Sequence, residues 1–147
     1  MSWATFEVAA PDLAAEGRRL IARTGDVLLA TVRADEPPRI HPISVGIVEG
    51  QLYAFILSGP KRLDLERDGR YAMHAQQDPL APSEFSVRGH AWGVTDQDTR
   101  RRVAGAWSFE VDEGYGLFVF DVEAAILGAR PTADAWPPLY TSWRAAR

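Results

Sequence analysis

Three runs of alternating apolar residues, separated by two short turns, lie between residues 27 and 57. The runs cover residues 27–34, 39–48 and 51–57, and the turns hold Asp35-Glu36-Pro37-Pro38 and Glu49-Gly50. Alternation with a period of two is typical of a half-buried strand, and such short turns join neighbouring antiparallel strands. The segment therefore predicts an antiparallel meander, and the fold must be built around it.

The rest of the chain extends this sheet. Further strands are predicted over residues 71–75, 84–95 and 116–127, helices over residues 11–24, 62–68 and from Asp96 to about 107, and a last short strand near 140–144 within a tail over 128–147. Small residues in the fifth strand, such as Gly89, permit a close approach of another backbone or a sharp bend of the barrel. The length fits one domain. We predict a single domain over residues 1–147, mainly β with short helices, whose six strands form an antiparallel barrel.

Composition excludes several classes of function. The chain has no cysteine, so it forms neither a disulfide framework nor a thiolate metal site. The three histidines fall on different predicted strands without the spacing of a metal site, so no metal is expected. The net charge of -4 argues against nucleic-acid or anionic-membrane binding. No run is long enough to span a membrane and the start lacks a signal-peptide pattern, so we expect a cytoplasmic protein.

Two cations mark a candidate anion site. Lys61 is the only lysine of the chain, and it follows the third strand in a Ser58-Gly59-Pro60-Lys61 turn. Arg39 opens the second strand, and in a meander these two strand ends lie on the same edge of the sheet. Arginine binds phosphate in a bidentate manner and lysine acts as a mobile point charge. The alternative is that both are solvated charges and that Ser58 and Gly59 merely form a turn.

Several segments together resemble the pyridoxamine 5'-phosphate oxidase-like family. The segments are residues 30–35, 38–43, 50–55 and 61–68, followed by Gly69-Arg70-Tyr71 and the Phe85-x-Val-x-Gly-x-Ala91 strand, and they lie in the order and spacing that the family shows. The resemblance implies a split β-barrel of the FMN-binding type. It also implies a homodimer with flavin or deazaflavin sites at the subunit interface.

The resemblance also implies which residues bind the cofactor. They are Arg39, Ile40, His41, Pro42 and Ser44 along the second strand, Ser58, Gly59 and Lys61 at the turn, and Trp92 as an opposite wall. Arg39 and Lys61 would hold the phosphate. The implied activity is an FMN- or deazaflavin-dependent oxidoreductase that transfers hydride to or from a small organic substrate. No side chain has the signature of a catalytic acid or base, so a non-catalytic barrel that binds flavin or haem is the alternative.

The chain also departs from the family pattern. Glu36 stands in the first turn where the family commonly has glycine. The arginine-rich phosphate cluster and the substrate-binding tail of true pyridoxamine phosphate oxidases have no clear counterpart. We therefore do not expect vitamin B6 to be the substrate.

Overall fold

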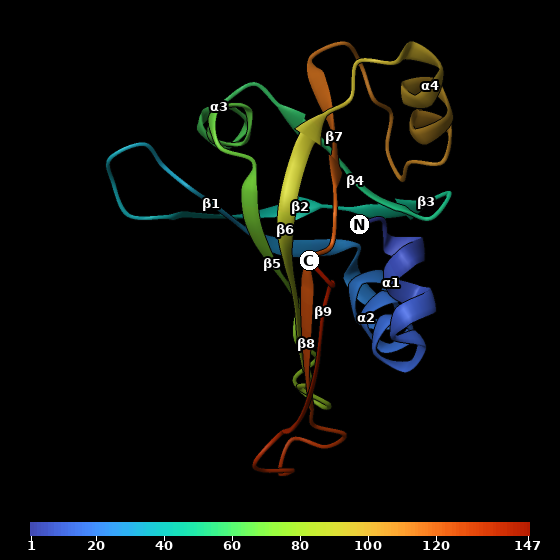
Figure 1. Cartoon of the computed structure of the whole chain (residues 1–147), viewed down its shortest axis with the longest axis vertical. Helices are drawn as coiled ribbons and strands as arrows, with labels where there is room; N and C mark the ends of the chain where they lie inside the picture. Colours follow the sequence, from blue (N-terminus) through green and yellow to red (C-terminus); the bar gives the residue numbers. More distant parts are fainter.

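The computed structural model describes residues 1–147, and it shows a strongly curled sheet with helices at its sides (Figure 1). The elements are α1 (Trp3–Ala9), α2 (Pro11–Thr24), β1 (Asp26–Thr31), β2 (Arg39–Ser44), β3 (Gly46–Val48), β4 (Gln51–Leu57), α3 (Pro60–Arg67), β5 (Arg70–Ala75), β6 (Glu84–Gly93), α4 (Gln97–Gly105), β7 (Tyr115–Phe120), β8 (Ala124–Ala129) and β9 (Leu139–Arg144). None of the helices has the length and apolar character needed to cross a membrane.

The sheet is antiparallel throughout. Its strand order is β2-β1-β5-β6-β7-β4-β3, and β8 pairs with both β6 and β9. Because β3 follows β2 directly but pairs with β4, the two ends of the sheet are joined and the sheet curls into a barrel. The prediction of a mainly β, antiparallel barrel is confirmed. Nine strands are present rather than six, because two predicted strands are each divided and the short strand expected in the tail forms β9.

One predicted strand is divided at Val45. The strand expected over residues 39–48 ends at Ser44, and a new one begins at Gly46. The Val45 amide donates to the Gly25 carbonyl at 3.0 Å, and this is the last hydrogen bond between β2 and the β1 side of the sheet. At Gly46 an added Cβ would lie 2.8 Å from the Trp107 ring, so the backbone passes close beneath that side chain. Before this point the chain pairs with β1 as β2, and after it the chain pairs with β4 as β3.

A second predicted strand, residues 116–127, is divided at Asp121. β7 pairs with the last residues of β6, and β8 pairs with the first ones. The chain crosses β6 at Gly89, where an added Cβ would lie 2.4 Å from the Asp121 carbonyl oxygen. That oxygen accepts a hydrogen bond from the Tyr71 hydroxyl at 2.5 Å. The small residues of this strand left a close backbone approach and a barrel bend as alternatives, and at Gly89 another backbone does approach closely.

Two helices cover one side of the sheet (Figure 1). The sequence did not predict α1, which begins where the Ser2 hydroxyl accepts from the Thr5 amide and which buries Trp3 and Phe6. α2 occupies its expected residues and ends at Gly25 in the left-handed conformation. It packs so closely on β6 that Gly17 lies against the Phe85 ring.

Replacing Gly17 with alanine is expected to destabilise the fold by about 1–3 kcal/mol, because the new methyl overpacks the core. An added Cβ would lie 2.2 Å from the Phe85 ring. The better helix propensity of alanine offsets only part of this cost. Urea unfolding of the variant measures the change. Gly105→Ala is the control, since no atom lies within 4 Å of the Cβ at that helical position, and it should not destabilise.

The sheet presents two different faces. The inner face carries most of the core, including Val27, Leu29, Met73 and Phe85. The outer face follows from the strand register and carries Leu28 and Ala30 of β1, Ile40 and Pro42 of β2, Ala72 and His74 of β5, Ser86 and Arg88 of β6, and Ala124 and Ile126 of β8. Leu28, Ile40 and Ile126 are exposed there. The side covered by helices is thus a closed core, and the other side is uncovered and carries exposed apolar side chains together with polar ones such as Arg88.

Candidate functional site

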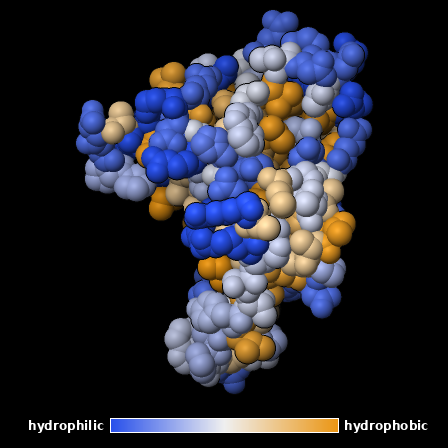
Figure 2. All heavy atoms as spheres, viewed as in Figure 1, coloured by the Kyte–Doolittle hydropathy of each residue, from blue (hydrophilic) through white to orange (hydrophobic).

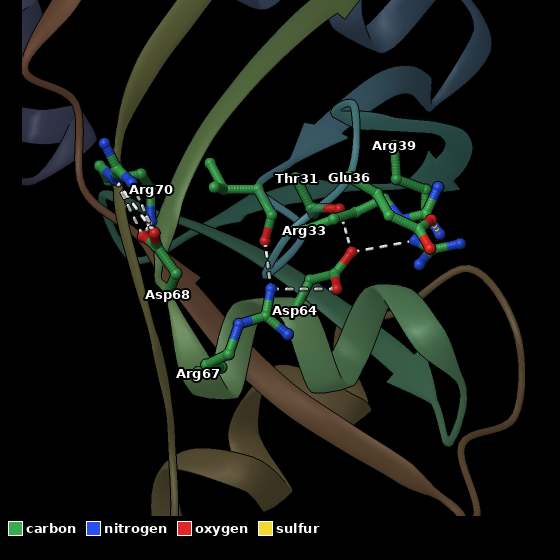
Figure 3. Close-up of polar contacts among 9 residues, drawn as sticks. Thr31, Arg33, Glu36, Arg39, Asp64, Arg67, Asp68 and Arg70 are labelled. Atoms are coloured by element: carbon green, nitrogen blue, oxygen red, sulfur yellow. Dashed lines mark hydrogen bonds and ion pairs between the residues drawn. The ribbon is translucent and has the colours of Figure 1, made fainter.

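A buried carboxylate joins α3 to the first two strands. Asp64 is 3% exposed, and one of its oxygens accepts from Thr31 Oγ1 at 2.8 Å and from Arg39 Nε at 2.9 Å. Arg67 Nη2 lies 3.4 Å from the other oxygen (Figure 3). Since Thr31 and Arg39 are paired across β1 and β2, Asp64 binds two adjacent strands at once. The Nη groups of Arg39 form no hydrogen bond and remain available to a ligand.

Asp64 keeps its charge in this setting. Burial raises the pKa of Asp64, but the hydrogen bonds from Thr31 and Arg39 and the Arg39 charge outweigh it, so the net pKa lies below the ordinary 3.8. A carboxyl whose pKa is lowered by folding stabilises the folded state above its unfolded pKa, and that stabilisation is lost as pH falls through the folded pKa. At neutral pH Arg39 is therefore held by a full negative charge.

The turn before α3 has the features of an anion site. Lys61 forms no ion pair or hydrogen bond with any residue. Gly59 caps the helix without a side chain, and no atom lies within 4 Å of its Cβ position. The amides of a helix N-terminus and the helix dipole favour an anion, and here a free lysine stands in the same turn. Ser58 is exposed beside them and accepts a 3.4 Å contact from Arg62.

His41 is affected by the charges of both cations. Its Nε2 is buried and has no hydrogen-bond partner. Burial lowers the pKa of His41 below its ordinary 6.5, and the positive charges of Lys61 and Arg39 lower it further. Both charges therefore act on one imidazole, which is neutral at neutral pH. An unpartnered buried nitrogen is costly unless a ligand or water satisfies it.

The pKa of His41 should report on the site. We expect NMR titration of the free protein to place it below 6.5, and a bound phosphate should raise it by adding negative charge beside the imidazole. Since folding depresses this pKa, the folded state loses stability relative to the unfolded state as pH falls from 6.5 through the folded pKa. His41→Gln assigns the resonance. A pKa at or above 6.5 in the free protein would contradict the described environment.

The predicted residues do not all meet at this site. Arg39 and His41 point to the inner side of the sheet with the Ser58-Gly59-Lys61 turn nearby, whereas Ile40 and Pro42 point to the outer face, because successive side chains of a strand alternate. The Ser44 hydroxyl donates to Asp26 at 2.8 Å. Trp92 is 52% exposed at the end of β6, and its ring neighbour is His90 at 5.2 Å. No hydrogen bond or ring contact joins Trp92 to Arg39, His41 or Lys61.

Sequence reasoning missed the part played by Thr31 and Asp64. Arg67 and Asp64 do form the helix ion pair that their spacing suggests, but Asp64 is buried rather than solvated. Thr31 was the available signal, because it falls on the same face as Val27 and Leu29, and a hydroxyl on a buried face needs a polar partner. No group of three His, Asp or Glu side chains is arranged to hold a metal ion.

An FMN-type phosphate fits the residues present. Lys61 supplies an uncompensated charge, and Gly59 leaves space for close approach. Because Pro60 has no N–H, the start of α3 supplies the amides of Lys61 and Arg62. The Nη groups of Arg39 and the unpartnered His41 nitrogen supply further donors. The arrangement can bind one oxyanion strongly, but it contains no nucleophile paired with a base.

Comparison with known proteins places the fold. No family model and no curated protein sequence matches the chain. Among solved structures, a haem-binding protein from Mycobacterium smegmatis superposes with a TM-score of 0.63 at 18% identity over 88% of this chain. The chain spans only 57% of that protein.

Two structures from Clostridium acetobutylicum match over nearly their whole length. A protein related to general stress protein 26 of Bacillus subtilis, of the pyridoxinephosphate oxidase family, gives a TM-score of 0.68 at 11% identity. A NimC/NimA family protein gives 0.66 at 15% identity. Both alignments cover 88% of this chain and 92% of the other chain. At these identities the similarity shows a common fold, and the split barrel that the sequence resemblance implies is confirmed.

Proposed function

We propose, from the split-barrel fold that this chain shares with pyridoxamine 5'-phosphate oxidase-like proteins, that it binds FMN or a deazaflavin and is an oxidoreductase acting on a small organic substrate. The observation that carries the proposal is the uncompensated Lys61 at the open start of α3, beside the unpartnered nitrogen of His41. A phosphate would satisfy these groups together.

Each residue has a defined task in this proposal. Lys61 and the first amides of α3 hold the phosphate, and Asp64 positions Arg39 so that its Nη groups reach the same anion. His41 stays neutral and offers Nε2 for a hydrogen bond. The flavin, when bound, supplies the hydride chemistry, while the protein positions it and excludes water. No side chain is assigned the role of catalytic acid or base.

A titration tests the proposal. Purified protein is titrated with FMN, with a deazaflavin and with haem, and binding is followed by visible absorption and flavin fluorescence. Saturation at one flavin or deazaflavin per subunit supports the proposal and selects which redox assay to use, with quinones and enones as acceptors. Failure of both to bind to a folded protein would overturn it.

We also propose that the apolar outer face of the sheet binds a second copy of this chain. Leu28 and Ile40 are exposed on neighbouring strands with Pro42, and Ile126 lies on the same face. An exposed apolar face of this kind marks an interaction surface. Ile40 and Pro42 alternate with Arg39 and His41 along β2, so this interface would adjoin the phosphate site. That arrangement agrees with a cofactor held between two subunits.

Replacing Ile40 with glutamate should therefore weaken dimerisation at least about tenfold, because a charge would be buried in an apolar interface. Ile40 is 65% exposed in one subunit, so the folded monomer should tolerate the change. Light scattering on a size-exclusion column measures the mass. Leu80→Glu is the matched control, since Leu80 is also exposed but lies in the loop before β6. A wild-type monomer, or equal effects of the two variants, would contradict the proposed interface.

Haem is the second candidate ligand, and His74 favours it. His74 Nδ1 donates to the Ala75 carbonyl at 2.7 Å, since that oxygen can only accept, and this leaves Nε2 free to bind a metal. His74 stands on the apolar outer face beside Leu28. The haem arm of the titration tests this candidate, and a Soret shift that His74→Ala abolishes would favour haem over flavin.

A further inference from the structure

A cavity beside the C-terminal strand gathers arginines that have no partner. Its volume is about 400 Å³, which is within the range of small-ligand pockets. Its lining includes Met1, Arg88, Glu123, Ala124, Arg144 and Arg147. The side chain of every arginine donates a hydrogen bond or forms an ion pair, except those of Arg88, Arg144 and Arg147. All three exceptions line this one cavity.

The sheet register brings two of these arginines together. Arg88 of β6 pairs with Ala124 of β8, and Ala124 pairs with Arg144 of β9. The three residues form one cross-strand row on the outer face. With neighbouring strands about 4.8 Å apart, the two arginine backbones are about 10 Å apart, so both guanidinium groups can reach one ligand. Ala124 between them is small and leaves room above the sheet.

The charge balance of the cavity is positive. Glu123 is the only acidic side chain that lines it, and it forms no ion pair with the arginines. The Met1 amino group is already paired with Asp121 at 3.0 Å. Figure 2 shows a strongly hydrophilic patch near the centre of the viewed face, close to where the chain ends in Figure 1. Three uncompensated guanidinium groups repel one another unless an anion lies between them.

We propose that Arg88, Arg144 and Arg147 form a second binding site, separate from Lys61, for the phosphate or carboxylate groups of a small anionic ligand. Arginine suits both groups because its planar donors bind such oxyanions in pairs. Phosphate and carboxylate groups are both oxyanions that arginine can bind. The soluble anion that binds best therefore distinguishes a phosphorylated ligand from a polycarboxylate. Arg62, Arg67 and Arg70 do not offer a comparable site, because each forms an ion pair with Glu66, Asp64 or Asp68.

Isothermal titration calorimetry of the full chain tests this proposal, with inorganic phosphate, pyrophosphate and citrate as probes. We expect saturable binding of at least one probe, and the Arg88→Ala/Arg144→Ala double variant should weaken it at least about tenfold. Preference for pyrophosphate would indicate a phosphorylated ligand, and preference for citrate a polycarboxylate. Arg101→Ala is the control, because it removes one exposed charge from α4 and should leave binding unchanged.

Several results would overturn the proposal. One is the absence of saturable binding of all three probes at millimolar concentration, and another is equal weakening by Arg101→Ala. Loss of the same binding in Lys61→Ala would show that the anion occupies the α3 site instead. A change of oligomeric state in the double variant, with anion affinity retained, would show that the arginines pair with a second subunit. Flavin affinity is measured on the same variants, so failure here leaves the proposed function standing.

Discussion

Replacing Lys61 with alanine is expected to weaken flavin binding about 10- to 100-fold. A hydrogen bond to a charged group contributes about 1.5–3 kcal/mol, and each 1.4 kcal/mol corresponds to a factor of ten. Lys61 has no partner within the chain, so its removal leaves no new unpaired carboxylate. The dissociation constant of whichever flavin binds the wild type, measured by fluorescence quenching, gives the effect directly.

Two further variants separate charge from geometry in the Lys61 experiment. Lys61→Arg keeps the charge and should retain most of the affinity, although the planar guanidinium cannot reproduce the point-like ammonium. Arg101→Ala removes a distant positive charge and should change affinity little, since its pair with Asp98 is exposed. If Lys61→Ala folds like the wild type and binds flavin equally well, the phosphate does not lie at the start of α3.

Replacing Asp64 with alanine is expected to lower the free energy of unfolding by about 3 kcal/mol. Removing one partner of a buried ion pair typically costs about 3–5 kcal/mol, and the lower end applies because the Arg39 side chain keeps some contact with solvent. The same change leaves the buried Thr31 hydroxyl without its acceptor. Urea unfolding followed by tryptophan fluorescence measures the loss.

The pH dependence of the Asp64 variant provides an independent check. The difference in stability between the wild type and Asp64→Ala should be full above the unfolded pKa of aspartate and should shrink as pH falls through the lowered folded pKa of Asp64. Asp98→Ala, which breaks an exposed pair, should cost less than about 1 kcal/mol. A difference that stays constant into strong acid would show that Asp64 stabilises the fold through packing alone.

The local pattern of the chain predicts most of its elements. Alternation located the strands around Val27 and Phe85, the Glu49-Gly50 turn forms between β3 and β4, and Pro11 and Gly25 bound α2 as expected. Alternation could not show where a continuous apolar run stops pairing with one strand and begins to pair with another. That change depends on long-range contacts, such as the approach of Asp121 to Gly89, which periodicity does not contain.

The candidate site, too, could be predicted only in part from the sequence. Lys61 and Arg39 were visible as cations at strand ends, and the structure places both near His41. Ile40 and Pro42 belong to the other face, because a run of consecutive residues cannot point one way from a strand. The unpartnered state of Arg88 and Arg144 was invisible, since it depends on which carboxylates the fold places near the other arginines.

The structure of the complex with the flavin that binds would show directly where the phosphate lies. We predict a phosphate within hydrogen-bond distance of Lys61 Nζ and of the Lys61 and Arg62 amides, with His41 Nε2 no longer unpartnered. A phosphate held elsewhere, with Lys61 still free in solvent, would contradict it.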